Sequence, residues 1–427
     1  MDRDQIYYVL FEQQKDFKDE RLKIIPRELT TQIISFLPLK LPIVITGVRR
    51  SGKSTLLKIL TQELKLEEKE FLYVNFNDER LISFTPDDFQ KILDFLEEQN
   101  YQRNCYLLID EIQEVSNWEK WIDRIKEKHP VIITGSNSKL LSKEISTVLT
   151  GRSINVSLYP FSFREFLKAK TISSDNANVD LKVQSKIRAA FSHYLESGGI
   201  PKAVIDDERI LGELYENIIY RDIIKRFNYR LEKPIKEISN ILLANTSKEL
   251  SLRAVSETTG ITNLLTTKSI LDTFEKAFFF FFMNRFDYSL RKQVQSPRKV
   301  YCVDNGFITK AGFRFSEDKG KLLENLVFIE LKRKNPEVYY FRGEKGCDFL
   351  IKEKTRITSA IQVCYTLNKE NRDREIAGLT EVMKKFKLKE GLLLTNSQEE
   401  EIKMGRKKII VRPVWKWSLQ ASNFFPK

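Results

Sequence analysis

The chain has 427 residues, and its Lys and Arg residues outnumber its Asp and Glu residues by 72 to 59, which gives a formal net charge of +13. Hydrophobic residues make up 41% of the chain and charged residues 31%, a composition that excludes fibrous and intrinsically disordered proteins. At ~150 residues per domain the length predicts about three domains. The positive charge favours polyanionic partners such as nucleic acid.

The sequence also excludes several classes of segment and site. Its first residues lack the basic and apolar stretches of a signal peptide, and the longest apolar run, residues 277–283, is far shorter than the ~20 residues that cross a bilayer. We therefore expect a cytoplasmic protein with no membrane partner, and we interpret this Phe-rich run as a buried strand. Four widely spaced Cys residues and only two His residues indicate neither a zinc site nor a disulfide framework.

In chain order, the first predicted element is an N-terminal helical lead-in over residues 1–38, which ends at a Leu-Pro pair. From residue 39 onward, short apolar runs alternate with amphipathic segments, a pattern typical of parallel strands that helices bury on both faces. The runs lie at residues 43–45, 71–76, 106–109 and 131–133. They predict an α/β domain over residues 39–170.

The rest of the chain predicts two further domains, over residues 171–300 and 301–427. The first is mostly helical, and within it a helix, a turn and a second helix before the Phe-rich strand resemble a winged helix-turn-helix. A lid that makes no DNA contact fits the same pattern. The second is mixed α/β, with a helix over residues 322–333 and strands at residues 338–341, 349–351, 360–363 and 392–394.

The most specific motif is a P-loop, which follows the first predicted strand and opens a helix. In such a loop the backbone N–H groups wrap the phosphates of a nucleotide, the lysine reaches the β and γ oxygens, and the hydroxyl that follows binds Mg²⁺. Lys53 and Ser54 hold these two positions. We therefore predict binding of ATP and Mg²⁺ by Gly47, Val48, Arg49, Arg50, Ser51, Gly52, Lys53, Ser54 and Thr55.

Two later strands end in polar residues that fit the same chemistry. The strand at residues 106–109 is followed by Asp110 and Glu111, a Walker B pattern. Asp110 is predicted to hold Mg²⁺, and Glu111 to orient and deprotonate the attacking water. The strand at residues 131–133 leads to Ser136 and Asn137, either of which could help to place that water, although a simple turn fits them as well.

With these motifs in order, followed by Gly151-Arg152 and by the segment at residues 158–166, the sequence resembles a family of prokaryotic AAA+ ATPases whose C-terminal half carries a restriction-endonuclease-like domain. The resemblance continues at residues 198–201, 220–223 and 301–306 and covers most of the chain. It implies a P-loop AAA+ core, a helical and winged-helix middle domain and an α/β endonuclease-like C-terminal domain.

The resemblance also implies roles for two arginines. Arg152 corresponds to an arginine finger that neutralises charge at the ATP of a neighbouring subunit, so it implies a homo-oligomeric ring, which we expect to be a hexamer. The alternative is a solvent-exposed arginine at a helix end. Arg221 is a candidate for a second phosphate-sensing arginine.

The same resemblance places a depleted nuclease site in the C-terminal domain. Glu324 and Asp348 match two of its acids, but Gln362 and Cys364 stand where active members carry a carboxylate and a lysine. Those two groups hold Mg²⁺ and position water. The resemblance therefore implies a degenerate nuclease core kept for DNA binding. Basic runs at residues 332–334, 384–385 and 406–408 support this interpretation, and Trp415 and Trp417 follow them as candidate contacts to DNA bases or sugars.

We therefore predict a DNA-binding AAA+ ATPase that hydrolyses MgATP in an oligomeric ring and remodels or translocates on DNA. Two alternatives stay open. One is an ATP-driven signalling or defence switch that binds a protein partner, and the other is a metal-dependent DNA nuclease.

Overall fold

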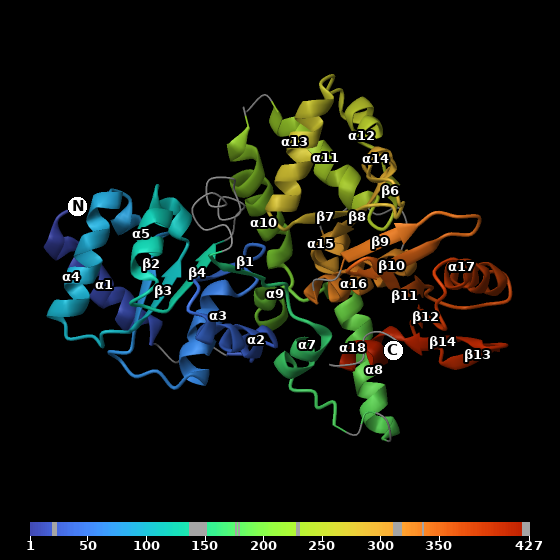
Figure 1. Cartoon of the computed structure of the whole chain (residues 1–427), viewed down its shortest axis with the longest axis horizontal. Helices are drawn as coiled ribbons and strands as arrows, with labels where there is room; N and C mark the ends of the chain where they lie inside the picture. The colour runs from blue at the N-terminus through green and yellow to red at the C-terminus, as the bar shows by residue number, and fades with distance from the viewer. Residues whose placement is uncertain are drawn as a thin grey trace. The chain divides into compact units, whose positions relative to one another are not determined.

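The computed structural model describes residues 1–18, 24–135, 152–175, 177, 180–227, 231–310, 318–334 and 337–420 (Figure 1). The candidates Ser136 and Asn137 lie outside these residues. The chain forms two compact units, Met1–Leu158 and Tyr159–Lys427. In the described part of the chain, no helix has both the length and the apolar character needed to cross a membrane.

The first unit is built on a parallel sheet of five strands in the order β2-β3-β4-β1-β5. Its strands are β1 (Ile43–Thr46), β2 (Phe71–Asn75), β3 (Tyr106–Asp110), β4 (Val131–Gly135) and β5 (Ile154–Ser157). The predicted α/β core is confirmed, because each apolar run from residue 43 to residue 133 forms one of these strands. Parallel strands are buried on both faces, so they carry continuous apolar runs that can be recognised in a sequence.

Helices cover both faces of this sheet. One face packs against α1 (Arg3–Phe17), α4 (Phe89–Glu98) and α5 (Trp118–Ile125), with Val44 pointing into that layer. The other face packs against α2 (Leu29–Phe36) and α3 (Lys53–Glu63), where Ile43 and Ile45 point. Successive side chains of a strand alternate between the faces, so each strand contributes to both cores.

Helix α1 also closes the edge of the sheet at β2. The side-chain amide of Gln14 accepts a hydrogen bond from Tyr73 N (3.0 Å) and donates one to Phe71 O (3.2 Å). Gln13 repeats this exchange with the N–H and C=O groups of Asn75, at 2.9 and 3.0 Å. Both glutamines are buried. They satisfy backbone groups that an edge strand otherwise leaves open.

The second unit begins with helices and a small antiparallel sheet in the order β6-β8-β7. Along the chain come α11 (Glu232–Ala244), β6 (Glu249–Leu250), α12 (Leu252–Thr259), α13 (Leu264–Lys276), β7 (Phe280–Met283) and, after the short helix α14 (Leu290–Gln295), β8 (Arg298–Cys302). Strand β8 crosses residue 300, so whether residues 171–300 and 301–427 behave as separate domains stays a prediction. The remaining helices of this part are α7 (Phe163–Ala169), α8 (Leu181–Ser197), α9 (Pro201–Ile205), α10 (Ile210–Asn217) and α15 (Asn305–Lys310).

The Phe-rich run is only partly the strand that we expected over residues 277–283. Ala277 caps helix α13, and its N–H still donates to Thr273 O at 2.9 Å. Phe278 has a left-handed backbone, with φ of 55°, and the strand begins only at Phe280. The end of the helix therefore takes up the first residues of the run. The side chains of these first residues are buried like those of the strand. The hydrophobic pattern of the sequence therefore could not distinguish the end of the helix from the start of the strand.

The C-terminal part contains a mixed sheet of six strands in the order β13-β14-β12-β11-β10-β9. Strands β11, β12 and β14 run parallel, and the other pairs are antiparallel. Helix α17 (Arg372–Lys385) packs on one face, and α16 (Lys319–Arg333) lies against the other through Phe328 and Phe349. The strands are β9 (Glu337–Phe341), β10 (Cys347–Glu353), β11 (Arg356–Val363), β12 (Glu390–Thr395), β13 (Glu400–Met404) and β14 (Lys407–Pro413), and α18 (Val414–Leu419) follows.

Candidate functional sites

The P-loop of the first unit connects β1 to α3 in a tight turn. Arg50 and Gly52 both have left-handed backbones, with φ of 66° and 93°. A Cβ atom on Gly47 would lie 2.2 Å from the carbonyl oxygen of Leu158, so this position requires glycine. The ammonium of Lys53 is buried and donates to Gly47 O (3.0 Å) and Val48 O (3.2 Å). The lysine therefore folds back across the loop.

Helix α3 begins at Lys53, directly after this loop. The first N–H groups of a helix have no acceptor within the helix, and its dipole favours an anion at this end. The loop and the helix start together form an arrangement suited to phosphate groups.

Arg27, which was not predicted from the sequence, binds the backbone of the P-loop. Its guanidinium is buried and donates to the carbonyl oxygen of Ser51 at 2.8 Å. The described chain has no cis peptide bonds, and in a trans peptide the C=O and the following N–H point in opposite directions. Since the Ser51 carbonyl points at Arg27, the N–H of Gly52 points away from Arg27.

The two predicted Mg²⁺ ligands lie together. Asp110, at the end of β3, is buried and accepts hydrogen bonds from the hydroxyls of Ser54, Thr134 and Tyr73, the last at 3.0 Å. Burial raises the pKa of Asp110, and the neighbouring charge of Glu111 adds to that effect. A hydroxyl and a carboxylate are oxygen ligands of the type that Mg²⁺ prefers, and a divalent cation beside Asp110 would offset the cost of burying its charge.

Glu111 stands at the point where β3 ends. Its N–H donates to Thr134 O at 3.0 Å, and its backbone is left-handed, with φ of 54°. The side-chain amide of Gln113 donates to the Glu111 carboxylate. Because of this left-handed turn, the side chains of Glu111 and Asp110 point in different directions and have different hydrogen-bond partners.

The two predicted arginines lie in different units. Arg152 is 61% exposed and forms a long ion pair, 3.6 Å, with Asp123 of α5. Such an exposed pair contributes little to stability. Arg221 is exposed on a π-helical turn, Ile218–Ile223, of the second unit. Their roles stay predictions.

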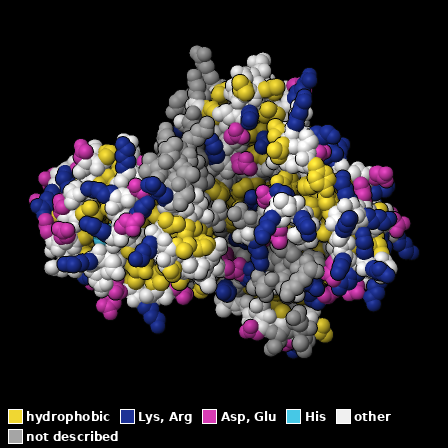
Figure 2. All heavy atoms as spheres, in the orientation of Figure 1, with side chains coloured by type: hydrophobic (Ala, Val, Ile, Leu, Met, Phe, Trp, Pro, Cys, Tyr) yellow, Lys and Arg dark blue, Asp and Glu magenta, His cyan; other side chains and the backbone are white. Residues whose placement is uncertain are grey.

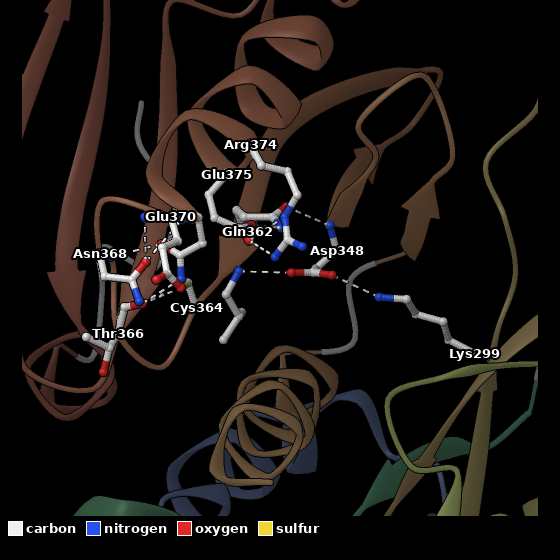
Figure 3. Close-up of polar contacts among 11 residues, drawn as sticks. Lys299, Asp348, Gln362, Cys364, Thr366, Asn368, Glu370, Arg374 and Glu375 are labelled. Atoms are coloured by element: carbon white, nitrogen blue, oxygen red, sulfur yellow. Dashed lines mark hydrogen bonds and ion pairs between the residues drawn. The ribbon is translucent and has the colours of Figure 1, made fainter.

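The acids predicted in the C-terminal domain meet around a lysine that the sequence analysis missed. The ammonium of Lys299, on β8, lies 2.9 Å from Glu324 Oε1 and 2.9 Å from Asp348 Oδ1. Figure 3 shows Lys299 reaching Asp348 from the side opposite Gln362. Tyr301 also donates to Glu324 Oε1 at 2.8 Å.

The electrostatics of this group follow from its burial. Burial alone would lower the pKa of Lys299, but the two carboxylates reverse that effect and raise it. Burial and the charge of Asp348 raise the pKa of Glu324, while Lys299 and Tyr301 hold it down. The lysine is therefore charged at neutral pH.

Gln362 and Cys364 hold the positions on β11 where a carboxylate and a lysine were sought. Gln362 accepts from Asp348 N (3.1 Å) and donates to Glu375 Oε2 of α17 (2.7 Å), as Figure 3 shows. Glu375 is also bonded to Arg374. Cys364 has a pKa raised by burial, and its thiol donates to Thr366 O at 3.1 Å. Among the described residues, no three His, Cys, Asp or Glu side chains are grouped so as to hold a metal ion.

Trp415 and Trp417 are buried, so the expectation that they contact DNA bases or sugars was wrong. Their side chains are 1% and 0% exposed. They lie on α18, which packs against α7, α8 and α16, and two large apolar rings at this junction are more favourable inside the core than on the surface.

The basic runs are only partly exposed. Lys407 donates to Met383 O at 2.9 Å and Lys408 pairs with Glu390 at 2.9 Å, whereas Arg406 is exposed in the turn between them and β13. Figure 2 shows Lys and Arg side chains gathered over α17 and the neighbouring strands. We call the exposed members the α17 basic patch: Lys384, Lys385, Lys387, Lys389, Lys403 and Arg406.

Known proteins resemble the chain in sequence along most of its length. A family model described as an AAA domain matches residues 40–167, and one described as a domain of unknown function matches residues 188–318. The chain is 35% identical to the uncharacterized protein MJ1544 of Methanocaldococcus jannaschii over 94% of this chain and 92% of that protein. It is 30% identical to an uncharacterized protein of Haemophilus influenzae, over 91% of this chain and 97% of that protein.

Solved structures resemble the chain more weakly. A signal transduction ATPase with numerous domains and a tetratricopeptide repeat sensor from Pyrococcus horikoshii matches 75% of this chain and 47% of its own, at 13% identity and a TM-score of 0.28. A TM-score this low does not establish a shared overall fold.

Proposed function

Since the chain belongs to the same family as MJ1544 of Methanocaldococcus jannaschii, and since its residues 40–167 form an AAA domain, we propose that it is an ATPase that binds MgATP at residues 47–55 and hydrolyses it. One observation carries the proposal. The hydroxyl of Ser54 and the buried carboxylate of Asp110 meet beside the loop after β1, at the carboxyl ends of the parallel strands.

Each group of this site has a part in binding or in hydrolysis. Lys53 donates to neutral carbonyl oxygens of its own loop, and charged phosphate oxygens are stronger acceptors for its ammonium. Ser54 and Asp110 would hold Mg²⁺, which stabilises negative charge on the transferred phosphoryl group. Glu111 would accept the proton of the attacking water, and Gln113 holds the Glu111 carboxylate in place.

The test is ATP binding and phosphate release by the purified chain. We expect Lys53→Ala to lose tight MgATP binding, whereas Lys120→Ala, an exposed lysine on α5, should bind as the unchanged protein does. A chain that neither binds ATP nor releases phosphate under any condition with Mg²⁺ would remove the proposal.

We further propose that the ATPase works in a homo-oligomeric ring, a hexamer, and acts on DNA. The order α11, β6, α12, α13, β7, β8 supports a winged-helix reading, and the α17 basic patch supports contact with phosphates. An electrostatic contact of this kind weakens steeply as the salt concentration rises, because bound counterions are released from the DNA.

Charge reversal tests the DNA contact. Replacing Lys384, Lys385 and Arg406 by Glu should weaken the binding of all duplex sequences and reduce its salt dependence, measured by fluorescence anisotropy. A matched control replaces Arg103, Lys120 and Lys128, three exposed residues of the first unit, with the same change in net charge. Equal losses in the two triple variants would assign the effect to net charge instead of the patch.

A second candidate function is a switch that binds a protein partner. It is favoured by the first turn of α13, where Leu264 and Leu265 are 45% and 74% exposed, since apolar side chains suit a protein surface better than a DNA phosphate. ATP hydrolysis that is stimulated by duplex, single-stranded, forked or four-way DNA favours the first candidate. Hydrolysis that no DNA stimulates favours the second.

A further inference from the structure

We propose that Lys299 is a built-in cation that takes the place of a divalent metal between Glu324 and Asp348, and that it keeps the C-terminal domain from cutting DNA. The first half of the inference concerns metal exclusion and needs neither ATP nor DNA. The second half rests on the proposed function, in which this domain contacts DNA.

The position of the ammonium carries the argument. One nitrogen lies 2.9 Å from an oxygen of each carboxylate. In nuclease-type sites a divalent ion is held by such a pair of acids. The ammonium bridges one oxygen of each acid, so the lysine and an ion held by both acids would compete for the space between them. The residues present therefore do not fit a resident metal.

The lysine is held in that place by its strand. Lys299 pairs with Glu249 of β6 on one side and with Met283 of β7 on the other, so its backbone is in the middle of the small sheet. Its side chain is 13% exposed and passes over the ring of Tyr340, with Nζ 5.9 Å from the ring centre. Moving the ammonium out would leave two largely buried carboxylates beside each other without the cation between them, which is unfavourable.

Further hydrogen bonds engage both carboxylates. Tyr301 donates to the same Glu324 oxygen as Lys299, and the N–H of Val363 donates to the second oxygen of Asp348, Oδ2, at 3.0 Å. Gln362 is neutral, and its side-chain oxygen accepts from Asp348 N. Mg²⁺ requires six oxygen ligands in near-octahedral geometry, so a site with the lysine in place lacks both the charge and the ligands.

The net charge of the group predicts what replacing Lys299 would do. Two carboxylates and one ammonium leave a net charge of −1 on the group, which suits hydrogen bonds but not a divalent ion. Removing the ammonium takes away the positive charge that lowers the pKa of Glu324 and opens a space between the two acids, where a divalent ion can supply the missing positive charge. The structure therefore predicts that a metal site appears when Lys299 is replaced, and that this new site depends on Asp348.

The experiment measures Mn²⁺ binding to the full-length chain, by electron paramagnetic resonance and by thermal unfolding with and without MnCl₂. All proteins carry Asp110→Asn, which silences the candidate Mg²⁺ site of the first unit, so a failure of the proposed ATPase does not affect the result. We expect no specific Mn²⁺ binding without a further change. We expect Lys299→Ala to unfold at lower temperature in EDTA and to regain stability with MnCl₂.

Two controls separate metal binding from general effects. Lys299→Ala combined with Asp348→Asn should gain no stability from MnCl₂, because one of the two acids that would hold the ion is gone. Lys352→Ala, which breaks the more exposed pair with Glu337, should show no response to MnCl₂. If Lys299→Ala does not fold, Lys299→Met keeps the apolar part of the side chain and serves instead.

Two outcomes would overturn the inference. One is specific Mn²⁺ binding with Lys299 present that disappears in Asp348→Asn, because the lysine would then yield to the metal. The other is a folded Lys299→Ala or Lys299→Met protein that binds no Mn²⁺. Cleavage of supercoiled DNA by the otherwise unchanged chain in MnCl₂, lost in Asp348→Asn, would refute the second half.

Discussion

Replacing Arg27 by Met should weaken MgATP binding while leaving the catalytic groups in place. The guanidinium of Arg27 is buried and donates to Ser51 O at 2.8 Å, which turns the N–H of the next residue, Gly52, away from Arg27. Met has a similar length but no donor. Without this hydrogen bond the peptide between Ser51 and Gly52 can rotate, and the N–H of Gly52 is no longer held in one direction.

The structure sets the scale of the effect. A hydrogen bond from a charged group contributes about 1.5–3 kcal/mol, which corresponds to a roughly 10- to 100-fold higher Kd if all of it is expressed in nucleotide binding. Titration with a fluorescent ATP analogue gives the Kd, and phosphate release at saturating ATP should fall much less. The Kd of Arg27→Lys should lie between those of the unchanged protein and Arg27→Met, because lysine keeps the charge but not the planar guanidinium group.

The matched control is Arg103→Met, since Arg103 is exposed and belongs to the same unit. Thermal unfolding shows whether Arg27→Met retains the fold. A folded Arg27→Met protein with the same Kd for MgATP as Arg103→Met would refute the argument from the peptide direction.

Three further predictions concern the same unit. Glu111→Gln should bind MgATP normally but lose on the order of 10²–10⁴-fold in turnover. As a control, Glu114→Gln, which changes an exposed acid nearby, should keep its turnover. Normal turnover in Glu111→Gln would show that Glu111 is not the base. Arg152→Ala should keep its ATP affinity and lose on the order of 10³-fold in turnover. Mixing Arg152→Ala with Glu111→Gln subunits should restore activity if the two residues act at a shared subunit contact. No recovery in stably mixed oligomers would contradict that role of Arg152. Gly47→Ala should lower both thermal stability and ATP affinity, because its Cβ would lie 2.2 Å from a backbone oxygen, and unchanged values of both would show that the loop can shift.

The nucleotide-binding half could be predicted from the sequence because its signals are local. Parallel strands appear as continuous apolar runs, and the P-loop motif depends on neighbouring residues, so the order of strand, loop and helix could be derived directly. Arg27 could not be recognised in this way. It meets Ser51 only after the chain folds, and no pattern around residue 27 marks it as buried.

The C-terminal site shows the opposite case. A lysine was expected on the strand that carries Gln362 and Cys364, but Lys299 reaches the two acids from another sheet and Glu375 approaches from α17. Trp415 and Trp417 were misjudged because basic neighbours suggested an exposed surface. Burial there depends on how α18 packs against helices far away in the chain, which composition cannot reveal.

The glutamine pair on α1 has a practical consequence for anyone who divides this chain. The matched AAA domain begins at residue 40, but the amides of Gln13 and Gln14 take the place that a further strand would occupy beside β2. A fragment that starts at residue 39 would present that strand with open backbone groups, and two such fragments could pair edge to edge. Self-association of the shortened fragment would then report the missing helix and not the assembly of the intact protein.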